Sequence, residues 1–262
     1  MKLGIIRNWD EGSFIWAAER SLDFLEFCVN AGYDVNEFCE KVPTLKEYIA
    51  KYGVSVGAVG RFGTSKLDAD GNISEEETRY SCKLIDAAVE LGCPVYVTGC
   101  NYVNTMSFFD NCARAIDYFS PVVEYGRKKG VKVATYNARY NNFVVCDPAW
   151  DVILNKVDGL GIKYDPANCI EHHDGNYLSE TKKWGNKFYH VHLKGISMIN
   201  GKFYDNPPAG LDQIDWGTFI GMLYGQSYAG GLSLEPHSGL WTGELGERGV
   251  DYSIRYFKPY IF

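Results

Sequence analysis

Short apolar segments alternate along this chain with longer amphipathic segments. Short apolar runs are typical of strands buried on both faces of a sheet, whereas apolar residues spaced three and four apart are typical of helices. The pattern predicts strands at residues 2–6, 34–38, 54–60, 94–100, 131–137, 160–165, 188–194 and 231–235. It predicts helices at residues 13–31, 44–52, 74–91, 107–129, 147–157, 179–184, 216–224 and 246–256.

These elements form eight strand-helix units in 262 residues. Eight is the number of such units at which a parallel sheet closes on itself, so the pattern predicts one (β/α)8 TIM barrel covering residues 1–262 as a single α/β domain. An open doubly wound sheet is the alternative, and it usually has a glycine-rich phosphate loop after its first strand. The first strand is followed instead by Arg7-Asn-Trp-Asp10, which favours the barrel.

Three of the predicted strands end in side chains that bind metals. Asp165, His192 and Glu235 fall at the carboxyl ends of their strands, where the active sites of such barrels lie. His190, His192 and Lys194 share one face of their strand, and burying that face without partners is costly. Oxygen and imidazole ligands suit a divalent ion, with Mn²⁺ preferred and Mg²⁺, Co²⁺ or Zn²⁺ as alternatives. A buried histidine-carboxylate pair without metal is the simpler interpretation.

Four motifs, in order, resemble those of the xylose isomerase-like barrel family. They are Gly161-Ile-Lys-Tyr-Asp-Pro-Ala-Asn168, His190-Val-His-Leu-Lys194, Pro208-Ala-Gly-Leu-Asp-Gln-Ile-Asp-Trp216 and Leu232-Ser-Leu-Glu-Pro-His237. The resemblance covers most of the chain from about Gly130 onward and the rest weakly. The family includes sugar and sugar-phosphate isomerases, ketose 3-epimerases, inosose dehydratase and relatives of endonuclease IV.

The resemblance implies that Asp165, His192 and Glu235 bind the metal. It also implies that Glu235 acts as a base and that Lys194 is a cation near a substrate oxygen. The expected activity is that of a metal-dependent sugar isomerase or epimerase, which removes the proton next to a carbonyl and passes through an enediolate.

One position departs from the family pattern. The fifth strand of these enzymes usually ends in a glutamate that is both ligand and acid-base group, and here Tyr136-Asn137 takes its place. Asn137 or the Tyr136 oxygen remains a possible ligand. Chemistry with a single base then becomes an alternative: a metal-dependent lyase that cleaves a C–O or C–C bond of a keto sugar or glycoside by β-elimination. Glu235 would remove the proton, and Tyr136, His237 or Lys194 would protonate the leaving group. A non-catalytic barrel subunit of a complex is a further alternative.

Polar and aromatic residues near the strand ends are candidates for substrate contacts. The predicted substrate-binding residues are Asn8, Trp9, Asn137, Arg139, Asn168, His190 and Trp241. Long connections at residues 138–146, 166–177 and 196–213 lie on the same rim, and residues 207–210 of the last one look like a shaped lid. Residues 171–174, Glu-His-His-Asp, are interpreted as a polar surface loop, with substrate binding by a histidine as the alternative.

Composition narrows the class of partner. A net charge of −7 makes a nucleic-acid surface unfavourable and leaves a sugar or glycoside as the expected partner. Eight scattered cysteines without a CxxC pair indicate free thiols in a reducing cytoplasm. No segment approaches the ~20 apolar residues of a membrane span. We also expect a homo-oligomer or a subunit of a complex.

Overall fold

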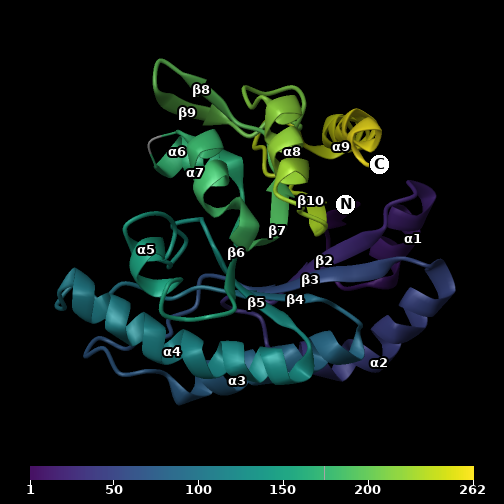
Figure 1. Ribbon diagram of the computed structural model, residues 1–262. Coiled ribbons are helices and arrows are strands. Elements are labelled where there is room, and N and C mark those ends of the chain that lie inside the picture. The colour runs from purple at the N-terminus through teal and green to yellow at the C-terminus, as the bar shows by residue number, and fades with distance from the viewer. Residues whose placement is uncertain (174) are drawn as a thin grey trace.

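Eight parallel strands close into a barrel, as the sequence pattern predicts (Figure 1). The structure is a computed structural model that describes residues 1–173 and 175–262. The strands follow the order β1-β10-β7-β6-β5-β4-β3-β2 around the barrel. Their bounds are β1 (Lys2–Ile6), β2 (Phe24–Cys28), β3 (Ser55–Arg61), β4 (Val95–Thr98), β5 (Lys132–Tyr136), β6 (Leu160–Tyr164), β7 (Phe188–Leu193) and β10 (Gly231–Leu234).

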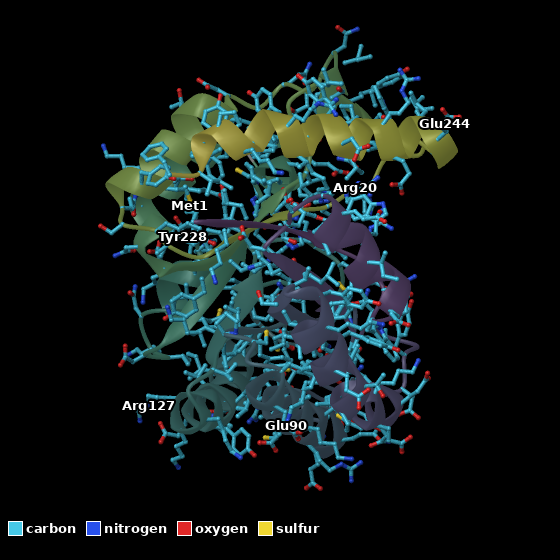
Figure 2. The ribbon with its side chains drawn as sticks, turned by 90° about the vertical axis from the view of Figure 1, so that its right-hand side faces the viewer. Met1, Arg20, Glu90, Arg127, Tyr228 and Glu244 are labelled. Atoms are coloured by element: carbon cyan, nitrogen blue, oxygen red, sulfur yellow. The ribbon has the colours of Figure 1, made fainter. Side chains whose placement is uncertain are left out.

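Helices surround this barrel. They are α1 (Glu11–Glu19), α2 (Val35–Tyr52), α3 (Glu75–Glu90), α4 (Phe108–Lys129), α5 (Ala149–Ile153), α6 (Pro166–His172), α7 (Tyr177–Trp184), α8 (Trp216–Gly225) and α9 (Gly243–Phe257), with 3₁₀ turns η1 (Gly185–Lys187) and η2 (Lys258–Tyr260). The last helix, α9, lies beside the first (Figure 2), and Arg20 Nε donates to Asp251 Oδ1 at 2.7 Å. This contact joins the two ends of the chain where β10 pairs with β1.

The predicted second strand is wrong. Residues 34–38 begin α2, where the Asp34 side chain caps the helix by accepting from Asn36 N at 2.8 Å. The true strand, β2, lies inside the segment predicted as a helix over residues 13–31. Leu22, Leu25 and Val29 have helical spacing by coincidence, because a strand buried on both faces carries no alternation. The helix ends before Ser21, whose φ of 51° is left-handed.

The long connection over residues 196–213 contains a hairpin that was not predicted. Its strands are β8 (Ser197–Ile199) and β9 (Lys202–Asp205). Asn200 and Gly201 have φ values of 52° and 74°, as the tight turn of a two-residue hairpin requires. The expected lid at residues 207–210 packs instead on α9, where Ser253 Oγ donates to Ala209 O at 2.8 Å. The hairpin projects beyond the helices (Figure 1).

A buried ion-pair cluster ties β3 to α3. Arg61 Nη2 lies 2.6 Å from Glu77 Oε1, and Lys66 Nζ lies 2.7 Å from Glu77 Oε2. Burial raises the pKa of Glu77, but the Arg61 hydrogen bond and the Lys66 charge outweigh it and lower the pKa to about 2. Glu77 therefore stabilises the folded state in its charged form.

Acid should weaken this cluster. The folded pKa of Glu77 lies below its unfolded value, so its contribution is present above about pH 4.5 and is lost as the pH falls toward 2. We expect a loss of roughly 2–3 kcal/mol from the free energy of unfolding across that window, measured by urea titration at several pH values. Glu77→Gln should flatten this dependence, whereas Glu76→Gln, at an exposed neighbouring position, should not. Equal pH profiles for all three proteins would contradict the prediction.

Candidate active site

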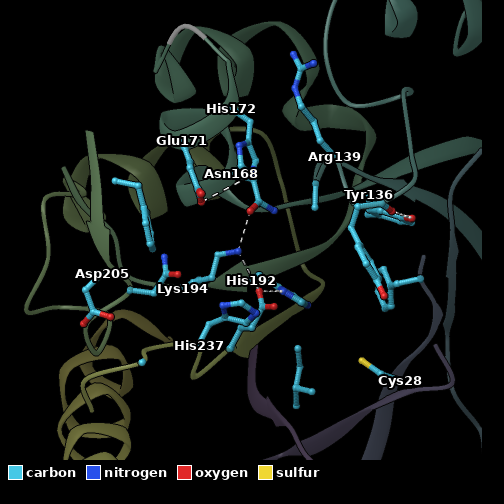
Figure 3. A pocket seen from close by; sticks show the side chains of 18 of the residues that line it. Cys28, Tyr136, Arg139, Asn168, Glu171, His172, His192, Lys194, Asp205 and His237 are labelled. Carbon is cyan, nitrogen blue, oxygen red and sulfur yellow. Dashed lines mark hydrogen bonds and ion pairs between the residues drawn. The ribbon is translucent and has the colours of Figure 1, made fainter. Parts of the chain in front are cut away.

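A cavity of about 920 Å³ opens at the carboxyl ends of the strands (Figure 3). Of the residues predicted to form the site, seven line it: Tyr136, Arg139, Asn168, His192, Lys194, Glu235 and His237. They come from four segments of the sequence: the end of β5 and the loop after it, the segment after β6, the end of β7 and the residue after it, and the segment after β10. The alternation of β7 explains why His192 and Lys194 reach the same side.

The three predicted metal ligands converge. One ligand atom from each of Asp165, His192 and Glu235 can be chosen so that all lie within 4.8 Å of one another. Asp165 Oδ1 caps α6 by accepting from Ala167 N at 2.9 Å. Asp165 Oδ2 is buried and forms an ion pair with Lys194 Nζ at 2.9 Å. A buried carboxylate beside an imidazole and a second carboxylate is a donor set that fits a divalent ion.

Glu26 is the main site residue that the sequence did not reveal. It is completely buried inside the barrel, and its Oε2 accepts from His190 Nε2 at 2.8 Å and from His192 Nε2 at 2.9 Å. Burial raises the pKa of Glu26, but the two histidines outweigh it and hold the pKa well below its ordinary range. A carboxylate behind a histidine is the usual support for a metal-binding imidazole, because it fixes the ring and its tautomer.

His192 is held between two carboxylates. Its Nδ1 lies 2.8 Å from Glu235 Oε2, on the side of the ring opposite Glu26. Burial lowers the pKa of His192, but the charges of Glu26 and Glu235 raise it by more, so the pKa lies above its ordinary value. For His190 burial prevails over Glu26, and its pKa is lowered. The two carboxylates therefore favour the protonated form of His192.

Lys194 supplies a fixed positive charge at the floor of the cavity. Its Nζ lies 2.7 Å from Asn168 Oδ1 and 3.6 Å from Glu235 Oε2. Burial lowers the pKa of Lys194, but Asp165 and Glu235 outweigh it, so the pKa is raised. Burial also raises the pKa of Glu235, yet Lys194 and His192 hold it well below its ordinary value. Lys163, which sequence analysis overlooked, is a second buried ammonium group lining the cavity.

The two residues that replace the family glutamate are committed to structural bonds. The Tyr136 hydroxyl donates to Tyr140 O at 2.7 Å, and burial raises the Tyr136 pKa. The Asn137 amide accepts from Asp165 N at 3.0 Å and donates to Asp165 O at 2.8 Å. Asn137 therefore orients the backbone of Asp165 and does not face the cavity, which corrects its predicted place among the substrate-binding residues.

Residues 171–173 do not form the predicted surface loop. Glu171 and His172 belong to the last turn of α6 and line the cavity, 3.7 Å apart. His173 turns away toward α7, where its Nδ1 lies 3.4 Å from Glu180 Oε1, and its side chain is only 3% exposed. Asp174 lies outside the described residues. Glu171 thus places a second carboxylate on the wall above Lys194 (Figure 3).

Four predicted substrate-binding residues lie elsewhere in the described chain. Trp9 packs edge-on against Phe38 at 5.4 Å between ring centroids, and the exposed Asn8 precedes it outside the cavity lining. His190 is completely buried beneath His192 in the barrel interior. Trp241 lies against Gly249 of α9 and lines a separate small pocket. None of these four residues lines the cavity.

The described helices include none that combines the length and apolar character required to cross a bilayer. Solved structures with the same fold include 3-keto-D-glucoside 4-epimerase from E. coli (TM-score 0.76, 15% identity, 99% of each chain covered). Also similar are D-psicose 3-epimerase from Clostridium cellulolyticum H10 with D-tagatose (TM-score 0.75, 14%, covering 100% of this chain and 99% of that one) and D-allulose 3-epimerase from Methylomonas sp. (TM-score 0.75, 13%, covering 100% and 98%). At these identities the likeness shows the fold alone.

Curated protein sequences contain no match to this chain. The model of the xylose isomerase-like TIM barrel family, however, matches residues 14–260, nearly the whole chain. The match includes β2, which the earlier resemblance covered only weakly, and all four motifs. The chain belongs to the xylose isomerase-like TIM barrel family.

Proposed function

We propose that this protein is a sugar isomerase or epimerase that requires a divalent ion, with Mn²⁺ preferred, and removes a proton next to a carbonyl. The position of Glu235 carries the proposal. Its carboxylate lines the cavity, and its Oε2 lies 2.8 Å from His192 Nδ1 and 3.6 Å from Lys194 Nζ. A carboxylate that lines the floor of a cavity, beside a metal-type donor set, is positioned to accept a proton from a bound substrate.

The chemistry divides among the residues of the floor. Asp165, His192 and Glu235 hold the ion, which when bound withdraws electron density from a substrate carbonyl and favours loss of the neighbouring proton. Glu235 accepts that proton, and the electron pair of the broken C–H bond moves toward the carbonyl oxygen to give the enediolate. Lys194 places its ammonium group near the negative oxygen and lowers the energy of that anion.

Glu171 supplies the acid-base group that the fifth strand lacks. It lines the cavity from α6, whereas Glu235 lies at the end of β10, and Figure 3 shows its side chain on the wall above Lys194. Glu235 removes a proton from one face of the substrate carbon, and a protonated Glu171 donates a different proton to the opposite face. This inverts the carbon, and the two carboxyl groups then regain their starting states by exchange with solvent. The similar structures, named as epimerases of keto sugars, support a carbonyl-bearing sugar as the substrate class.

A keto-sugar or glycoside lyase is the second candidate. His237 supports it, because its side chain is exposed at the edge of the cavity two residues after Glu235. In β-elimination Glu235 removes the proton and His237 protonates the departing oxygen. Removal of the α-proton by Glu235 precedes both outcomes, so the products distinguish them.

Proton NMR in deuterated water tests this function. The Mn²⁺-loaded protein is incubated with a panel of ketoses, aldoses and 3-keto glycosides, and the Mn²⁺ is removed before spectra are recorded. We expect loss of an α-proton signal together with the appearance of an isomer. Release of an aglycone would show the lyase instead. A metal-loaded protein that exchanges no proton in any compound would show a non-catalytic barrel.

Tyr136→Phe tests whether Tyr136 is a structural residue of the cavity wall or the acid that protonates a leaving group. The hydroxyl already donates to Tyr140 O, so we expect turnover within a few-fold of wild type and a stability loss of about 1 kcal/mol for the missing hydrogen bond. Steady-state kinetics and urea unfolding measure the two effects. Lost turnover with α-proton exchange retained would instead make Tyr136 the acid of an elimination.

A further inference from the structure

Apolar side chains gather around the mouth of the cavity. Among the described residues, thirteen large apolar side chains are exposed, and four of them line this cavity: Tyr140, Phe203, Tyr204 and Leu240. Each is between 48% and 59% exposed. Apolar surface concentrated beside a polar cavity is typical of a ligand-binding site. We call these four side chains the apolar wall.

The apolar wall is built from three segments, two of which are joined by hydrogen bonds. Tyr140 follows β5, Phe203 and Tyr204 lie on β9, and Leu240 follows β10. Ser238 Oγ donates to both oxygens of Asp205, at 2.8 and 2.7 Å, which joins the hairpin to the segment carrying Leu240.

The polar groups at the base of the hairpin are used internally. Asn206 Nδ2 donates to Gly195 O at 2.9 Å, and the Asp205 carboxylate accepts from Ser238. What β9 presents to the cavity is therefore mainly the rings of Phe203 and Tyr204. A group that contacts them gains by leaving water rather than by finding hydrogen-bond partners.

The cavity is larger than one sugar requires. Its volume of about 920 Å³ lies near the upper end of the ~300–1,000 Å³ that accommodate drug-sized ligands. Lys194 and Glu235 lie on the floor, Glu171 lies on a wall above Lys194, and the four side chains of the apolar wall are exposed along the same cavity. A single six-carbon sugar on the floor leaves the apolar wall uncovered.

We propose that the apolar wall is an aglycone subsite, which binds an aromatic group attached by a glycosidic bond to a sugar lying on the floor. This inference rests on the proposed function for the placement of the sugar. It extends that function by naming the substrate as a keto sugar that carries an aryl group through a glycosidic bond, rather than a free keto sugar. Continuity of the apolar wall with the cavity favours a ligand over a second copy of the chain.

Matched pairs of glycosides test the subsite. Binding of phenyl and methyl β-D-glucopyranoside, and of the corresponding galactosides, is measured by calorimetry with the Mn²⁺-loaded protein. We expect the phenyl member of at least one pair to bind roughly tenfold tighter, because its ring alone reaches the apolar wall. Phe203→Ser and Leu240→Ser should each reduce this ratio several-fold, whereas Val89→Ser, an exposed apolar position at the far end of α3, should leave it unchanged.

Three results would overturn the subsite. They are equal affinity within every pair, no binding of any glycoside, and a phenyl preference that Phe203→Ser and Leu240→Ser leave intact. Wild-type dimerisation that Phe203→Ser abolishes would assign the apolar wall to a second copy instead. If ketoses still exchange their α-proton while the phenyl preference is absent, the subsite fails and the proposed function stands. A phenyl preference without α-proton exchange in any compound would mean that the subsite stands and the proposed function fails.

Discussion

Glu235→Gln should abolish exchange of the substrate α-proton. An amide cannot accept the proton, and loss of a positioned base slows such steps by roughly 10²–10⁴-fold. Because Glu235 is also a proposed ligand, the rate is measured by proton NMR at Mn²⁺ concentrations that saturate the variant. Exchange at the wild-type rate would show that another group is the base.

Glu171→Gln is the matched control, since it changes a carboxylate that lines the same cavity without belonging to the metal-type cluster. We expect this variant to bind Mn²⁺ as the wild type does and to exchange the α-proton, yet to form the epimer slowly. The contrast between the two variants would assign proton removal to Glu235 and proton donation to Glu171. Identical loss of exchange in both would contradict this division.

Glu26→Gln should weaken the protein and its metal site together. The carboxylate accepts from His190 and His192 in the closed interior, and an amide presents an N–H to one of them. Leaving a buried charge without its partner costs roughly 3–5 kcal/mol. Loss of the carboxylate behind a metal-binding histidine lowers affinity by roughly 10–100-fold. Urea unfolding of the metal-free protein and Mn²⁺ calorimetry measure these effects.

Glu37→Gln is the control for this variant, because Glu37 is exposed on α2 and pairs with Lys41 at the surface, at 3.4 Å. Glu37→Gln should change neither the free energy of unfolding nor the Mn²⁺ affinity measurably. Reduced stability with unchanged Mn²⁺ affinity in Glu26→Gln would make Glu26 a packing residue with no role toward the metal.

Periodicity predicted the barrel and the β7 face well. Helices such as α3 and α4 carry one apolar stripe, and His190, His192 and Lys194 alternate with apolar residues, so their positions follow from spacing alone. The β2 segment has no such signal, because both of its faces are buried. Glu26, at the centre of this strand, therefore fits the polar face of the helix predicted over residues 13–31.

The remaining site residues depend on contacts that spacing does not encode. Glu26 meets His190 across 164 positions of sequence, and only closure of the barrel brings them together. Glu171 was misplaced because α6 is short and starts directly at its cap, Asp165, without an amphipathic repeat. The hairpin had a readable signal in Asn200-Gly201, the preferred pair for a two-residue turn.

A metal held by Asp165, His192 and Glu235 is the central claim, and anomalous diffraction from crystals grown with Mn²⁺ tests it most directly. We expect one anomalous peak in contact with Asp165 Oδ2, His192 Nδ1 and the Glu235 carboxylate, and no peak there in His192→Ala or Asp165→Asn. No peak at saturating Mn²⁺ in the wild-type crystal, or a peak that touches none of these three side chains, would contradict the claim.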